Sequence, residues 1–166
     1  MICRALIVVS VMAVTLFSGV TAFAQTAPDF ELPRLSKSST LRLSDLKGKV
    51  VYLDFWASWC GPCVVSLPEL EKLYTRYKNQ GFEVVAINLD SAQEDAQRFL
   101  QGKSISYPVL FDHQQKTPEQ YGVAGMPTAY LLDHTGKLRY THTGFKPNDG
   151  EKLSNLIQQL LKEKES

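Results

Sequence analysis

Residues 50–63, which read VVYLDFWASWCGPC, decide the fold of this chain. The first seven, Val50 to Trp56, favour β-structure and are nearly all apolar, which is typical of a strand buried on both faces. Pro62 then opens a helix that runs to about Asn79, with leucines and tyrosines at helical spacing, and Gly81 ends it. The two cysteines of this stretch therefore lie where a buried strand turns into a helix.

The same patterns place the other elements of an α/β domain. Strands are expected at Thr40–Leu43, Phe82–Leu89, Tyr107–Phe111, Thr128–Leu132 and Lys137–Thr143. Helices are expected from Ser91 to Gln101, where Ser91 and Glu94 match a capping box, over Thr117–Tyr121, and from Asn148 onward. Buried strands joined through helices predict a central sheet with helices on both faces, extended at one edge by an antiparallel hairpin. No internal repeat or linker divides the chain after its first residues.

Composition excludes several classes of protein. The 166 residues are 44% apolar and 21% charged, an ordinary globular balance that argues against disorder. The formal net charge is +1, so no surplus of lysine and arginine favours nucleic acid as a partner.

The first 24 residues have a different composition from the rest. Arg4 is followed by an uncharged, mostly apolar run that ends in Ala22-Phe23-Ala24, the pattern of a secretory signal cleaved before Gln25. The alternative is an uncleaved membrane anchor, because residues 5–24 are just long enough to cross a bilayer. We therefore expect a removed signal peptide at 1–24, a single domain at 25–166, and a periplasmic location, either free or anchored.

Cys60 and Cys63 are the cysteines that remain after such cleavage. At the start of a helix, free backbone N–H groups and the helix dipole stabilise a thiolate, which favours Cys60 as an exposed nucleophile. Cys63, one turn further on, is placed to resolve a mixed disulfide. Three alternatives are weaker: a zinc half-site lacks a second ligand pair, haem attachment requires His in place of Val64, and a purely structural bridge does not explain the strand-to-helix position.

Three further positions are candidates for chemistry. Asp54 interrupts a buried apolar strand, where a carboxyl group tends to have a raised pKa, and it is placed to take the proton of Cys63 through water. An inert, hydrogen-bonded Asp at a bulge is the alternative. Trp59 offers a flat apolar surface beside the thiols, whereas Trp56 is expected in the core. Pro127 lies at a turn before a strand, a position where cis bonds occur.

These motifs resemble the thioredoxin superfamily. The resemblance rests on the 50–63 stretch, on Ala27-Pro28-Asp29-Phe30 near the start of the domain, and on Tyr121-Gly122-Val123-Ala124-Gly125-Met126-Pro127-Thr128. Together with the intervening residues 91–116, they look like the exported thiol–disulfide oxidoreductases related to TlpA, ResA and the cytochrome c maturation thioredoxins. The implied architecture is a thioredoxin fold with an N-terminal β extension and a central helix–strand insertion.

The resemblance also implies a site and partners. Pro127 would be cis and lie against a redox disulfide between Cys60 and Cys63, and the backbone of Met126 would bind a substrate strand. The implied task is reduction of disulfide-containing proteins, sometimes for cytochrome c maturation, with electrons from a membrane thiol donor. We expect a monomer that needs no metal or organic cofactor. Many such reductases carry Glu where this chain has Ser66, which favours a broader reductant.

Two other functions are compatible with this fold. A thiol peroxidase is one, although its relatives place Pro and Thr before a lone cysteine and this chain has Trp56-Ala57-Ser58-Trp59 before Cys60. A redox-inert binding or chaperone module is the other. Loss of disulfide reduction in Cys60→Ser would separate an oxidoreductase from a binding module.

Overall fold

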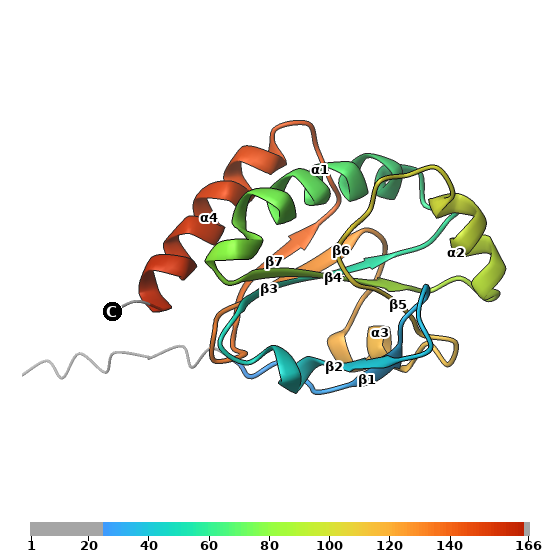
Figure 1. Cartoon of the computed structure of the whole chain (residues 1–166), viewed down its shortest axis with the longest axis horizontal. Coiled ribbons are helices and arrows are strands. Elements are labelled where there is room, and N and C mark those ends of the chain that lie inside the picture. The colour runs from blue at the N-terminus through green and yellow to red at the C-terminus, as the bar shows by residue number, and fades with distance from the viewer. Residues whose placement is uncertain (1–24, 165–166) are drawn as a thin grey trace, which may run out of the picture.

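Residues 25–164 are described by the computed structural model, shown in Figure 1. The strands are β1 (Glu31–Pro33), β2 (Thr40–Arg42), β3 (Val50–Trp56), β4 (Phe82–Asn88), β5 (Val109–Phe111), β6 (Thr128–Leu132) and β7 (Leu138–Thr143). The helices are α1 (Gly61–Tyr77), α2 (Gln93–Leu100), α3 (Lys116–Tyr121) and α4 (Asp149–Lys164), with 3-10 turns η1 (Leu43–Leu46) and η2 (Lys78–Gln80). The expected signal peptide, residues 1–24, lies outside the described residues. Within 25–164, no helix combines the length and apolar character needed to cross a bilayer.

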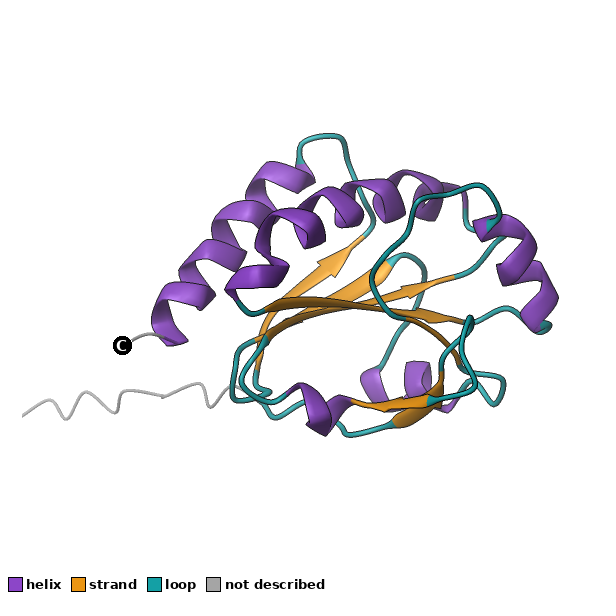
Figure 2. Cartoon of the chain, viewed as in Figure 1, coloured by secondary structure: helices purple, strands orange, loops and turns teal. Residues whose placement is uncertain are grey.

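The central sheet has the strand order β5-β4-β3-β6-β7 (Figure 2). Strands β3, β4 and β5 run parallel, while β6 and β7 are antiparallel to their neighbours, as the late hairpin predicts. Every residue of β3 is buried, because this strand lies at the centre of the sheet and both of its faces are covered. The carboxyl end of β3 therefore delivers the cysteine turn from the most rigid part of the fold.

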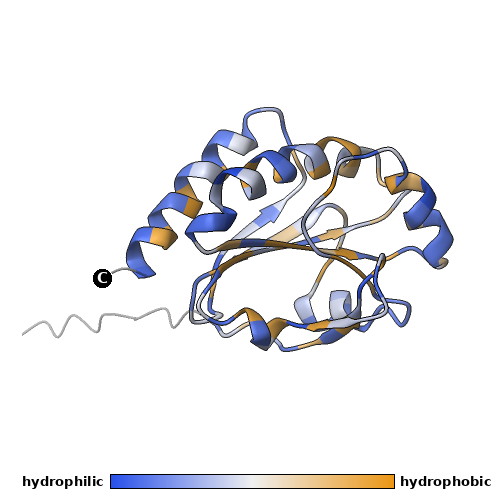
Figure 3. Cartoon of the chain, viewed as in Figure 1, coloured by the Kyte–Doolittle hydropathy of each residue, from blue (hydrophilic) through white to orange (hydrophobic). Residues whose placement is uncertain are grey.

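Alternate side chains of β3 belong to two separate core layers. Val50, Tyr52 and Trp56 join the layer beneath α1, α2 and α4. Val51 and Leu53 join the opposite layer, which is closed by the β1–β2 ribbon, η1 and α3. Figure 1 shows these elements on opposite sides of the sheet, and Figure 3 shows the apolar colouring of β3 and β4 between them. The expectation of helices on both faces is confirmed.

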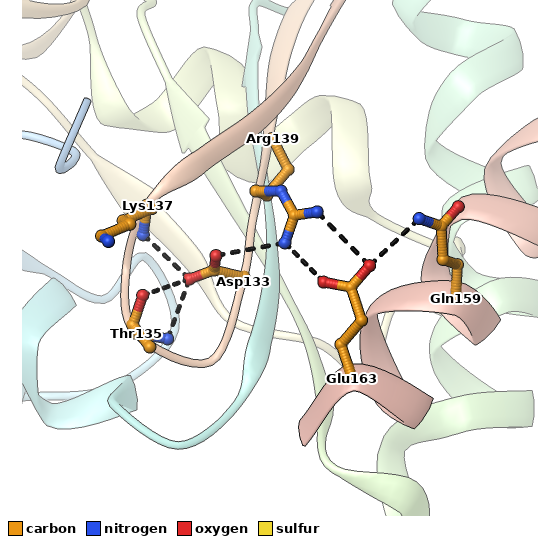
Figure 4. Close-up of polar contacts among 6 residues, drawn as sticks. All are labelled: Asp133, Thr135, Lys137, Arg139, Gln159 and Glu163. Carbon is orange, nitrogen blue, oxygen red and sulfur yellow. Dashed lines mark hydrogen bonds and ion pairs between the residues drawn. The ribbon is translucent and has the colours of Figure 1, made fainter. Parts of the chain in front are cut away.

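A polar network fixes the β6–β7 turn to the last helix (Figure 4). The carboxylate of Asp133 accepts hydrogen bonds from the Thr135 backbone at 2.9 Å, the Thr135 hydroxyl at 2.6 Å and the Lys137 backbone at 3.1 Å. Arg139 of β7 then donates to Asp133 at 3.4 Å and to Glu163 of α4 at 2.6 Å. The hairpin and α4 are thus held together by charge as well as by the apolar layer.

The capping box predicted at Ser91 is wrong. Helix α2 begins at Gln93, and its N-cap is Ala92, which is extended at φ −123° and ψ 133° and makes no side-chain capping bond. The residue before Ser91 explains the difference, because the carboxylate of Asp90 is bound to the Ser58 backbone at 3.1 Å. This contact holds the chain against the cysteine turn as it leaves β4, so the helix begins two residues later.

Candidate active site

The two cysteines form a disulfide at the start of α1. Cys60 is the N-cap of the helix, with extended backbone angles of φ −83° and ψ 102°, and Pro62 occupies the first turn. The Cα atoms of Cys60 and Cys63 are 5.3 Å apart, and the backbone N–H of Cys63 donates to the carbonyl of Cys60 at 3.1 Å. The position of Cys60 beside the free N–H groups of a 17-residue helix is the one that stabilises a thiolate.

Burial of the cysteines differs from the exposed nucleophile that the sequence suggested. Cys60 is only 4% exposed in the disulfide form, and Cys63 is fully buried. Cys60 nevertheless lines a cleft of about 750 Å³ on the molecular surface.

The cleft is lined by three segments that are distant in sequence. They are the Trp59–Pro62 turn, the end of β4 at Leu89, and a stretch of α3 with the loop Gly122–Met126 that follows it. Trp59 is 70% exposed, the largest apolar surface beside the disulfide. The sequence interpretation of Trp59 as an open surface and Trp56 as a core residue agrees with these positions, since Trp56 is fully buried.

Met126 lines the cleft, and the buried Pro127 follows it directly before β6. The Met126–Pro127 peptide bond is cis, as the resemblance implied. Pro127 is buried and its carbonyl accepts a hydrogen bond from the Gly144 backbone at 2.8 Å, while Met126 is half-buried and lines the cleft. The Thr128 hydroxyl donates to the Gly125 carbonyl at 2.6 Å, which holds the loop against the start of β6.

Asp54 lies beneath the cysteine turn, on the central strand β3. Its side chain follows the alternation of Tyr52 and Trp56 and so belongs to the layer that contains Cys63. The residue is 1% exposed, and its Oδ2 atom has no hydrogen-bond partner among the described residues. Burial raises the pKa of Asp54 from its ordinary 3.8 to about 8. The buried, ionisable carboxyl group expected from the sequence is present, and the alternative of a hydrogen-bonded Asp at a bulge does not fit.

Sequence reasoning missed Asp90, which holds the cysteine turn in place. Its carboxylate accepts hydrogen bonds from the Ser58 backbone at 3.1 Å, the Ser58 hydroxyl at 3.0 Å and the Asn88 amide at 2.9 Å. Asp90 is 2% exposed, so these are buried, charge-assisted bonds. A signal was present in the sequence: Asn88 and Asp90 are polar residues at the end of a buried strand, and the strand before it leads into the cysteine turn.

No metal site accompanies the disulfide in the described part of the chain. Within residues 25–164, histidine, cysteine, aspartate and glutamate side chains form no group of three or more able to hold a metal ion.

The Cys-Gly-Pro-Cys disulfide lies at the start of a helix that follows the central strand of an α/β sheet, and a cis-proline directly follows a loop that lines the same cleft. These features define a thioredoxin-fold thiol–disulfide oxidoreductase. Comparisons with known proteins agree. The family described as Redoxin matches residues 23–160. The ResA thiol–disulfide oxidoreductase of Geobacillus kaustophilus is 37% identical over 74% of this chain and 70% of its own length, and that of Bacillus subtilis is 31% identical over 84% and 80%.

Solved structures give the same result. A candidate thiol:disulfide interchange protein DsbE from Chlorobium tepidum superposes with a TM-score of 0.80 and 48% identity, covering 83% of this chain and 96% of that one. The exposed lipoprotein thioredoxin Etrx1 of Streptococcus pneumoniae gives a TM-score of 0.67 and 37% identity, covering 82% and 99%. The chain belongs to the Redoxin family and is a ResA/TlpA-like member of the thioredoxin superfamily. It is a protein-disulfide oxidoreductase.

Proposed function

We propose that this protein is exported and reduces disulfides in other proteins by a two-step exchange. The Cys60 thiolate attacks one sulfur of the target disulfide, a new S–S bond forms, and the other target sulfur leaves as a thiolate. Cys63 then loses its proton and attacks the Cys60 sulfur, which releases the second target thiolate. The target gains two electrons, and the protein is left with the Cys60–Cys63 disulfide.

The observation that carries this proposal is the Cys60–Cys63 disulfide at the start of α1. The unpartnered carboxyl group of Asp54, in the core layer that contains Cys63, adds a candidate proton acceptor. A pKa of about 8 for Asp54 lies close to the ordinary value of a cysteine thiol, about 8.5. Proton transfer between groups of similar pKa is nearly balanced in free energy, whereas a carboxylate of ordinary pKa is a far weaker base. We therefore assign Asp54 the role of accepting the Cys63 proton through a water molecule, with Trp59, Met126 and Pro127 binding the target segment.

Three variants test the exchange mechanism on a protein substrate such as insulin. We expect Cys60→Ser to abolish reduction, and Cys63→Ser to accumulate a mixed disulfide. Asp54→Asn should leave the first step unchanged and slow release of the reduced target at least tenfold, given the usual contribution of general base catalysis. Unchanged release in Asp54→Asn would remove Asp54 from the mechanism, and reduction that survives Cys60→Ser would refute the exchange itself. Consumption of peroxide without any protein disulfide would instead identify a peroxidase.

The location and the partners are parts of the same proposal. Residues 1–24 have the pattern of a signal, so N-terminal sequencing of exported protein should begin at Gln25; a retained Met1 would indicate an anchor. We propose electrons from a membrane thiol donor and a monomeric protein, which sedimentation tests.

A role in cytochrome c maturation is the narrower form of this proposal. Ser66 is buried, and its hydroxyl donates to the Cys63 carbonyl at 3.2 Å, so the position beside the resolving cysteine is neutral. This neutrality supports a broader set of substrates. Targets trapped by Cys63→Ser decide between the two: an apocytochrome c alone indicates the dedicated role, and a varied set indicates the broader one.

A further inference from the structure

The cleft beside Cys60 carries one negative charge. Among the described residues that line it, Glu119 of α3 is the only formally charged side chain; the others are apolar, glycine, cysteine or the neutral Gln115. Glu119 is exposed, and within residues 25–164 its carboxylate makes no ion pair. A single unpaired carboxylate in an otherwise apolar binding cleft favours a partner that brings a positive charge.

Trp59 lines the same cleft and adds a second attraction for a cation. Its indole is 70% exposed, and the face of an indole ring is the strongest cation–π acceptor among the side chains. A guanidinium group stacks on an aromatic face while its N–H groups remain free to donate to a carboxylate in the ring plane. Trp59 and Glu119 therefore suit arginine better than lysine, whose ammonium group cannot satisfy both in this way.

The wall that carries Glu119 is held in place. Asp112 accepts hydrogen bonds from the Thr117 backbone at 2.8 Å and the Thr117 hydroxyl at 2.6 Å, which fixes the first turn of α3. Gln115, whose φ of +49° lies in the left-handed region, donates from its side chain to the Leu89 carbonyl at 3.0 Å and ties this wall to the end of β4. These contacts fix the backbone that carries Glu119, so its exposed carboxylate stays on this wall of the cleft.

We infer that the cleft selects extended protein segments in which arginine lies within a few residues of the reacting cysteine. This inference rests on the proposed function, because the segment enters the cleft as the target of Cys60. An ion pair between exposed side chains changes a rate or binding constant by about 1.4- to 5-fold. We therefore expect a segment with Arg to react about threefold faster than one with Gln, and a segment with Glu to react more slowly than one with Gln by a comparable factor.

The experiment uses the reduced full-length protein and a set of short cysteine peptides activated as 2-pyridyl disulfides. Each peptide carries Arg, Lys, Gln or Glu at one position within three residues of the cysteine. Attack by Cys60 on the peptide sulfur forms the mixed disulfide and releases pyridine-2-thione, whose absorbance reports the second-order rate constant. The Arg/Glu rate ratio in the wild type, divided by the ratio in Glu119→Gln, isolates the contribution of Glu119 from the intrinsic reactivity of each peptide.

The matched control is Glu94→Gln, which removes an exposed carboxylate from α2, outside the cleft. We expect the Arg/Glu rate ratio to fall in Glu119→Gln to the smaller part that Trp59 supplies, to fall further in Glu119→Lys and to be unchanged in Glu94→Gln. Trp59→Leu should remove the advantage of Arg over Lys. Equal rates for Arg and Glu peptides at every position, or an Arg/Glu ratio in Glu119→Gln equal to that of the wild type, would overturn the inference while leaving disulfide exchange intact. Failure of every peptide to react would instead refute the exchange proposal together with this one.

Discussion

Replacing Asp54 with Asn should stabilise the protein, and the gain should depend on pH. A carboxyl group whose pKa is higher in the folded protein than in the unfolded chain destabilises the fold when it ionises. Its contribution to stability is complete below the pKa of the unfolded chain and is lost as pH rises through the pKa of the folded protein. For Asp54, this loss of stability takes place between pH 3.8 and about pH 8. Each tenfold change in proton affinity corresponds to about 1.4 kcal/mol, so full ionisation of Asp54 lowers the free energy of unfolding by roughly 6 kcal/mol. Roughly 4 kcal/mol of this loss is present at pH 7.

The Asn variant removes this cost but places an amide beside the same unpartnered surroundings. An unsatisfied buried amide costs about 1–3 kcal/mol, so the expected net gain is about 2 kcal/mol at pH 7; it falls to zero at about pH 5, and at pH 4 the variant is less stable than the wild type by roughly 1–2 kcal/mol. Urea unfolding of the oxidised proteins between pH 4 and pH 8 measures the difference, with the cysteines excluded from titration by the disulfide. Glu94→Gln, at an exposed position, is the control and should change the unfolding free energy by less than about 0.5 kcal/mol. A difference between Asp54→Asn and wild type that is the same at pH 4.5 and pH 7.5 would refute the raised pKa.

Three other substitutions test the scaffold around the site. Asp90→Asn removes the charge that binds the Ser58 backbone and hydroxyl, so we expect a loss of about 1.5–3 kcal/mol and faster hydrogen exchange at the Ser58 amide; unchanged exchange would contradict the role of Asp90. Arg139→Ala breaks the ion pair with Glu163 at a partly exposed position, and a loss of only about 0.5–1 kcal/mol is expected in urea unfolding; a loss well above that would mean that the pair is not screened by solvent. Leu70→Ala empties a fully buried position of α1 and should cost about 2–5 kcal/mol, measured by thermal unfolding; a smaller cost would show that the layer collapses around the cavity.

Most of the central sheet could be predicted because its strands are buried on both faces. The apolar run at Val50–Trp56 matches β3 residue for residue, and Phe82–Leu89 differs from β4 by one residue. A charge inside such a run is conspicuous, which is why Asp54 stands out from the sequence alone. Short elements were less predictable: the sequence indicates no strand at Glu31–Pro33, where β1 forms, because three residues carry too little pattern.

Features that depend on contacts between distant segments could not be predicted. The start of α2 depends on the bond between Asp90 and Ser58, which are 32 residues apart, so the local capping pattern was misleading. The cleft beside Cys60 includes residues of α3, which lie more than 50 positions away in the sequence, and the left-handed Gln115 before this helix gives no signal in the sequence. Local patterns thus identified the reacting sulfurs but not the walls around them.

The N-terminal ribbon has a consequence for self-association. Strand β5 ends the parallel side of the sheet, and an unprotected edge of this kind offers free backbone groups to another chain. Here the Leu35 backbone donates to the Val109 carbonyl at 2.8 Å, and Arg34 forms a bridge with Leu110. The segment ahead of β2 thereby occupies the hydrogen-bonding positions that a second molecule would use, and protects this edge of the oxidoreductase against edge-to-edge aggregation.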